Sequence, residues 1–206
     1  MNEGGHHRLE IFGTVLLSAA ALATSWAGFQ ATLWSGDQLE YANRSIALRS
    51  QSTRASTRAG QLVAIDVGMF TSWMTERFRG DSLLRRFLEQ HFRSEFRVAF
   101  DEWVKSDPLR SPTAEPTPFA LVSYHLSASD SAHRYELAAD STENLSTHAN
   151  ATSDAYVLTA VVLATVMFFA GTAQQMKGRN LRLFLLCLAT VACIGGVVRL
   201  FTLPRG

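Results

Sequence analysis

Three runs of apolar residues stand out along the chain, at residues 9–29, 156–174 and 183–203. Each is about long enough to cross a bilayer as a helix, which takes about 20 residues. One polar stretch of roughly 125 residues separates the first two runs, and only a short basic turn separates the last two. The pattern predicts an all-α integral membrane protein with three transmembrane helices and one large polar domain.

The polar domain itself has helical patterning. Residues 30–78 contain no proline, and their apolar positions recur at Leu62, Ile65, Met69 and Trp73, which predicts that the first span continues as a long stalk helix. Residues 81–105 predict a second, amphipathic helix, with Asp81 as its N-cap. Its apolar stripe comprises Leu84, Leu88, Phe92, Phe96, Ala99 and Trp103.

Four of the five prolines fall between residues 107 and 118. Proline removes a backbone donor, so this segment reads as an irregular elbow. A third helix is expected from about Leu126, running directly into the second span. The predicted domains are residues 1–30 (N-terminus and first span), 31–155 (an elongated helical bundle) and 156–206 (the second and third spans).

Basic residues beside the spans predict the orientation. The turn before the third span carries Lys177, Arg179 and Arg182, whereas the dozen residues before Tyr156 contain no lysine or arginine. Because cytoplasmic loops are enriched in these residues, we expect the turn and the N-terminus, with His6, His7 and Arg8, to be cytoplasmic. Residues 31–155 and the C-terminus are then extracytoplasmic, although Arg205 argues weakly against this.

Aromatic residues at the span ends are candidate interfacial anchors, since tryptophan and tyrosine are enriched at membrane surfaces. They are Trp26, Trp34 and Tyr156. The first span also permits a second interpretation, a signal peptide cleaved after Ala23, because a basic start and an apolar run precede a small-residue triplet. Either outcome exports the polar domain.

Composition excludes several classes of function. The formal net charge is +1, and residues 32–155 hold 13 basic and 16 acidic residues, so no basic excess attracts nucleic acid. Both cysteines lie in the third span, on different helix faces, and predict neither a disulfide nor a metal pair. The four histidines of the polar domain lack zinc-ligand spacing. We expect no catalytic residue, metal or cofactor, and no enzymatic activity.

The two predicted helices that extend from the membrane, the stalk and the returning helix, carry opposite charges. The stalk carries Arg44, Arg49, Arg54 and Arg58, and the returning helix carries Asp130, Glu136, Asp140, Glu143 and Asp154. An antiparallel hairpin would place Arg44 near Glu143, and Arg49 near Asp140 or Glu136. The first interpretation is mutual neutralisation, worth about 0–1 kcal/mol per exposed pair. The alternative is that symmetry-related copies turn the arginines inward as an anion-attracting ring.

Asp66 is a candidate buried acid, because apolar residues surround it in the stretch QLVAIDVGM at residues 61–69. A buried carboxylate is costly unless it is paired. We expect an arginine partner, Arg93 or Arg97, with a proton or ion site as the alternative.

Several segments resemble a family of uncharacterised three-pass bacterial inner-membrane proteins. They are WAGFQATLWSG at residues 26–36, STRAST at 52–57, the pairs Ile65-Asp66 and Asp107-Pro108, and the series Phe96, Phe100 and Trp103. The resemblance covers nearly the whole chain. It implies a multi-pass topology and a bacterial inner-membrane location, and it carries no activity or functional residue.

The predicted function is that of a non-enzymatic membrane protein that self-associates as an assembly or interaction module, with the lipid bilayer as its surroundings and its protein partner unknown. Small residues in the first span would permit close helix contact, either between copies or within one subunit. They are Gly13, Ser18, Ala19, Ala20, Ala21 and Ala23. The alternative is an oligomeric ion channel, lined by the stalk arginines and by hydroxyls of the first two spans. Those hydroxyls belong to Thr14, Ser18, Thr159, Thr165 and Thr172.

Overall fold

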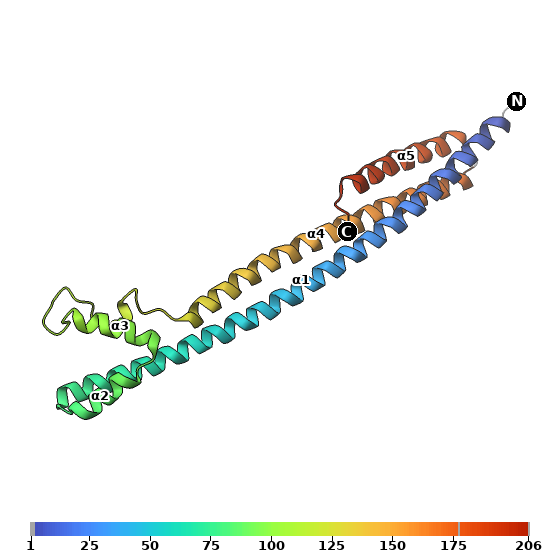
Figure 1. Ribbon diagram of the computed structural model, residues 1–206. Coiled ribbons are helices and arrows are strands. Elements are labelled where there is room, and N and C mark those ends of the chain that lie inside the picture. Colours follow the sequence, from blue (N-terminus) through green and yellow to red (C-terminus); the bar gives the residue numbers. More distant parts are fainter. Residues whose placement is uncertain (1–2, 177, 206) are drawn as a thin grey trace. The chain divides into compact units, whose positions relative to one another are not determined.

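The computed structural model is all-helical (Figure 1), with 86% of the residues in helices. It describes residues 3–176 and 178–205, and this part of the chain contains no strand. Lys177 and the side chains of His6 and Arg8, on which part of the orientation argument depends, lie outside the described part.

Helix α1 extends over 77 residues, Glu3–Arg79, so the first apolar run and the predicted stalk are one uninterrupted helix. No proline interrupts it, and the helix ends where a glycine follows. Gly80 has φ +85°, in the left-handed region that glycine adopts without steric cost. Its N–H donates to the carbonyl of Glu76 at 3.0 Å.

The predicted single helix over residues 81–105 is wrong, because two helices replace it. They are α2, Ser82–His91, and α3, Ser94–Lys105. Asp81 caps α2 as expected, accepting hydrogen bonds from the N–H groups of Leu83 and Leu84. The chain is extended at Phe92 and Arg93, which redirects α3 so that its apolar face is buried while α2 buries none of its residues.

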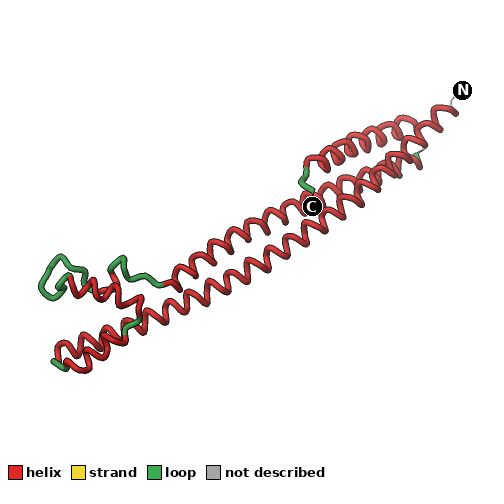
Figure 2. The backbone as a smooth tube through the Cα atoms, viewed as in Figure 1, coloured by secondary structure: helices red, strands yellow, loops and turns green. Residues whose placement is uncertain are grey.

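The proline-rich segment is irregular, as predicted, apart from the short 3-10 helix η1, Pro118–Ala120. Figure 2 shows it as the long loop that follows α3. The Trp103 indole N–H donates to the Glu115 carbonyl at 2.8 Å, which fixes the loop to α3. Loop and helix therefore belong to one packed unit.

Helix α4, Ser127–Gln175, joins the predicted third helix to the second span without a break. Helix α5, Arg179–Thr202, follows after a short connection. Each of α1, α4 and α5 is long and apolar enough to cross a membrane. One expectation is corrected here: Arg182 lies within α5 and is buried, because the helix begins at Arg179 and turns residue 182 inward.

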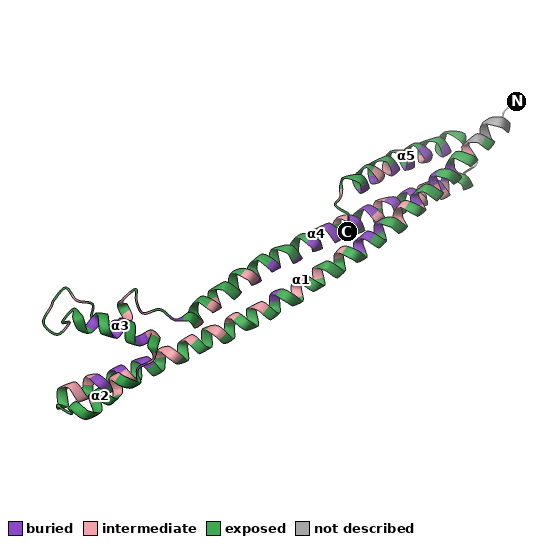
Figure 3. Cartoon of the chain, in the orientation of Figure 1, coloured by how far each residue is buried: buried purple, intermediate pink, exposed green. Residues whose placement is uncertain are grey.

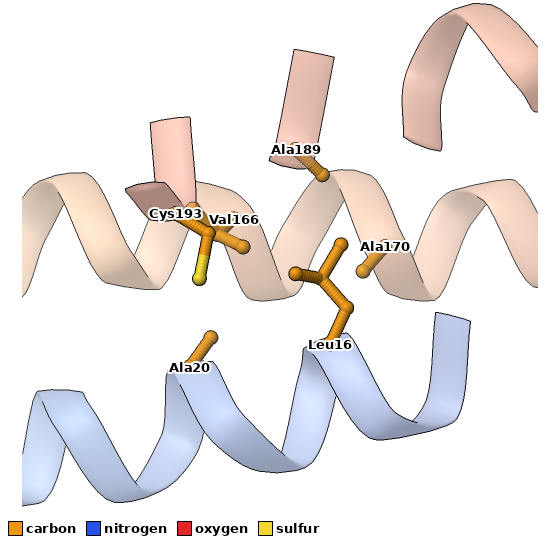
Figure 4. Close-up of a cluster of buried hydrophobic side chains, with 6 residues drawn as sticks. All are labelled: Leu16, Ala20, Val166, Ala170, Ala189 and Cys193. Carbon is orange, nitrogen blue, oxygen red and sulfur yellow. The ribbon is translucent and has the colours of Figure 1, made fainter. Parts of the chain in front are cut away.

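The chain divides into two compact units. One comprises Met1–Arg44 with Ser141–Gly206, and the other is Ser45–Asp140. In the first unit, small and apolar side chains from α1, α4 and α5 point towards one another (Figure 4). Ala20 is fully buried there, so part of the small-residue surface of the first span serves contacts within one subunit.

The Ser45–Asp140 unit has an aromatic core. Its buried members are Phe70, Trp73, Phe92, Phe96, Phe100 and Trp103. Phe96 is fully buried, and its ring lies 5.2 Å, centroid to centroid, from the stacked ring of Phe119. Edge-to-face and stacked pairs add to the area that these rings bury, so the cluster stabilises this unit.

Candidate functional site

Asp66 is completely buried in α1. Its Oδ2 accepts a hydrogen bond from Arg93 Nη1 at 2.7 Å and another from the Tyr124 hydroxyl at 3.0 Å. The expected arginine partner is therefore Arg93. Arg97 instead donates to the carbonyls of Glu89 and Gln90. The second carboxylate oxygen of Asp66 is buried and accepts no hydrogen bond within the described part of the chain.

Arg93 also pairs with Glu95, and Glu95 in turn holds the start of α4. The Oε1 atom of Glu95 accepts from the Ser127 N–H at 3.1 Å and from the Ser127 hydroxyl at 2.7 Å. Glu95, which lies in α3, thus caps the N-terminus of α4, where a negative charge is favourable. We call these five residues, Asp66, Arg93, Glu95, Tyr124 and Ser127, the Asp66 network.

The network shifts the pKa values of its carboxyl groups in opposite directions. Burial raises the pKa of Asp66 against the effects of Tyr124 and Arg93, and the hydrogen bonds from Ser127 lower the pKa of Glu95. Burial and the neighbouring Asp66 raise the pKa of the Tyr124 hydroxyl. The ion pairs and hydrogen bonds of the network therefore link α1, α3 and α4. No described group of three or more histidine, cysteine or acidic side chains could hold a metal ion.

The stalk arginines are all exposed. Arg49 Nη2 lies 3.0 Å from Asp140 Oδ1, so this pair has the register expected of the hairpin. Ser45 and Ser52 hydroxyls donate to the carbonyls of Ala139 and Ala132 along the same contact. Arg44, Arg54 and Arg58 take part in no ion pair with another described residue.

A groove of about 820 Å³ runs between α1 and α4 in the unit that holds the three candidate spans. Its α1 wall has a small residue every four positions, at Thr24, Gly28, Thr32 and Gly36, and α4 contributes Ser153, Val157, Ala160, Val161 and Ala164. We call this the small-residue groove. Gly28 and Gly36 are exposed, and a Cβ added at either would meet nothing within 4 Å.

Helix α2 presents a second open surface, as its largely exposed ribbon in Figure 3 illustrates. Leu83, Leu84 and Phe87 are all exposed, and so is Phe78 at the end of α1. We call these four residues the α2 patch. The amphipathic pattern of residues 81–105 predicts the helix, but only the break at Phe92 and Arg93 explains why Leu83, Leu84 and Phe87 are left exposed. Leu88, on the same helix, packs partly against the aromatic core.

The three candidate interfacial anchors differ in their surroundings. Trp26 is exposed, at 46%, and Trp34 donates from its indole N–H to the Pro204 carbonyl at 3.2 Å. Tyr156 differs from the expectation, because its side chain is fully buried. Its hydroxyl also donates to the Pro204 carbonyl, at 3.0 Å, so the ring packs inside the unit.

The hydroxyls considered for a pore all donate hydrogen bonds within their own helices. Each of the five donates to a carbonyl three or four residues earlier; they are Thr14, Ser18, Thr159, Thr165 and Thr172. Thr159 is also almost fully buried, at 1% exposure. Thr14 Oγ1 also accepts a hydrogen bond from Gln174 Nε2 at 3.5 Å, between α1 and α4.

The fold and its surfaces define a class: an all-α protein with three helices able to cross a membrane and with two open contact surfaces, the small-residue groove and the α2 patch. In comparisons with known proteins, no family model, no curated protein and no solved structure matches this chain.

Proposed function

We propose that this protein is a non-enzymatic, multi-pass protein of the bacterial inner membrane that acts as an assembly module by forming a homo-oligomer. Its N-terminus is cytoplasmic and residues 31–155 are extracytoplasmic. The single observation that carries the proposal is the small-residue groove. Thr24 and Gly28 lie one turn apart at the end of the first span, where small residues let a second helix approach closely in lipid, and van der Waals packing then drives association. Thr32 and Gly36 continue the same surface beyond the span.

The α2 patch supports the same proposal outside the span region. A group of exposed, large apolar residues is typical of a surface that another protein covers. Its members expose large fractions of their side chains, up to 82% at Leu83. A second copy of the chain, or a partner held by the assembled oligomer, would bury them.

Replacing Gly28 with leucine is expected to weaken self-association by about tenfold or more, because the larger side chain separates the packed helices. The matched control is Gly60→Leu, which makes the same change at an exposed glycine of the same helix outside the groove. Light scattering on the detergent-solubilised proteins, over a dilution series, measures both. Equal association of the two variants would exclude the small-residue groove as the contact.

A conducting oligomer is the second candidate, and the exposed arginines without a described ion pair favour it. If the arginines ring a pore, planar bilayers with inserted protein conduct, and reversing Arg44, Arg49, Arg54 and Arg58 to glutamate shifts preference from anions to cations. The assembly module predicts no conductance above that of protein-free lipid for either protein. We expect no conductance above that of protein-free lipid. An anion-selective current in the unmodified protein that becomes cation-selective in the variant would contradict this expectation.

A further inference from the structure

The described lining of the small-residue groove carries no charge. The charged residues of α1 at this level are Asp37, Glu40 and Arg44, which recur every three or four positions and therefore share one face of the helix. Asp37 lies two residues from both Ser35 and Leu39, which line the groove. Two residues correspond to about 200° around an α-helix. The charges of α1 therefore lie on a different side of the helix from the groove.

The α1 wall of the groove allows the closest approach of another helix. Gly28 and Gly36 both belong to this wall, and a Cβ added at either glycine would meet nothing within 4 Å. The α4 wall is bulkier, because Val157 and Val161 line it and are 49% and 55% exposed. A helix seated in the groove would therefore pack its backbone against α1 and its flank against the two valines.

Leu39 extends the groove beyond the first apolar run. It lines the groove three residues after Gly36 and is 62% exposed. In water, an exposed leucine is stabilised when it is buried against another apolar side chain. The α1 wall thus offers close backbone contact at Gly28 and apolar burial at Leu39.

We propose that helix α1 of a second copy fills the small-residue groove, parallel to α1 and in register about a two-fold axis. Two copies with the same orientation in one bilayer are related by an axis perpendicular to it, which makes their α1 helices parallel. The groove of each copy then holds α1 of the other. This contact presupposes the self-association proposed above and assigns it to one helix.

The uncharged lining favours a second copy as the occupant. A two-fold contact places each residue near the same residue of the other copy, so charged residues in it would repel their own counterparts. The groove avoids this repulsion, and it offers no charge that would select a different, oppositely charged partner.

Cysteine cross-linking of the full chain in its membrane tests the contact. The background carries Cys187→Ala and Cys193→Ala, which remove both native cysteines, and a single cysteine is introduced by Ser35→Cys or Leu39→Cys. A disulfide forms only where the two Cα atoms approach within about 7 Å. Oxidation should therefore link each variant into a species of two-chain mass.

Asp37→Cys and Glu40→Cys are the matched controls, since both residues are exposed at the same level of α1 on its charged side. These variants should stay unlinked under the same oxidation. Adding Gly28→Leu to Ser35→Cys should abolish the cross-link, because the larger side chain separates the two helices. Adding Gly60→Leu, outside the groove, should leave the cross-link unchanged.

Equal cross-linking at all four positions would overturn the proposed contact. So would the absence of cross-links at Ser35→Cys and Leu39→Cys in a protein that light scattering shows to be oligomeric, and in both cases the proposed self-association still stands. An assembly with an odd number of chains, which a two-fold axis cannot relate, would overturn the contact as well. A protein of one-chain mass without any cross-link contradicts the proposed function itself.

Discussion

Replacing Phe96 with alanine is expected to destabilise the Ser45–Asp140 unit by about 3–5 kcal/mol, the usual cost of truncating a buried aromatic side chain. Phe96 is fully buried and lies at the centre of the aromatic core, with ring contacts to Phe70, Phe92, Phe119 and Tyr124. The close packing of these rings leaves the remaining side chains unable to fill the space.

Denaturant unfolding followed by tryptophan fluorescence measures this effect. In a background where Trp26 and Trp34 are replaced by phenylalanine, the signal comes from Trp73 and Trp103, both buried in this core. The control is Val122→Ala, at a residue that is 98% exposed and lies outside the α2 patch. We expect the control to cost less than about 1 kcal/mol. Equal losses would show that the aromatic core does not stabilise this unit.

Replacing Arg93 with methionine is expected to have the second large effect. It should lower the free energy of unfolding by about 3 kcal/mol at neutral pH. The substitution leaves the fully buried Asp66 carboxylate with only the Tyr124 hydroxyl, and breaking a buried pair from one side strands an uncompensated charge. Arg97→Met is the matched control, since Arg97 is exposed and contacts only backbone carbonyls in the described chain. It should cost less than about 1 kcal/mol.

Two further measurements test the cause of this loss. Adding Asp66→Asn to Arg93→Met removes the stranded charge and should restore most of the lost stability. Lowering the pH should also narrow the gap between Arg93→Met and the unmodified protein. Burial already raises the pKa of Asp66. A carboxyl group with a raised pKa in the folded state contributes its full stabilisation below the pKa of the unfolded state. That contribution is lost as the pH rises through the pKa of the folded state. A gap independent of both changes would contradict the buried-pair explanation.

The long helices could be predicted from the sequence because their signals are local. Absence of proline over residues 30–78 and apolar spacing predict the continuation of α1, and Asp81 predicts the start of α2. The partner of Asp66 could be narrowed to two arginines, since burial of an acid requires a cation. Counting from the two ends of the hairpin likewise narrows the partner of Arg49 to Asp140 or Glu136, and Asp140 is the one that forms the ion pair.

The remaining features depend on tertiary contacts that have no local signal. The break at Phe92 and Arg93 contains neither glycine nor proline, and it follows from the core contacts of Phe92 and the bond from Arg93 to Asp66. Arg182 looks like part of a basic turn until the start of α5 turns it inward. The small-residue groove combines one face of α1 with one face of α4, so neither segment alone reveals it.

The molar mass of the detergent-solubilised protein, measured by light scattering with the detergent contribution subtracted, tests the proposed self-association most directly. One chain has a mass of 22.7 kDa. The assembly module predicts a single species at an integral multiple of this mass, which persists on dilution and is lost in Gly28→Leu but kept in Gly60→Leu. A species of one-chain mass at all concentrations, from membranes extracted under mild conditions, would contradict the proposed homo-oligomer.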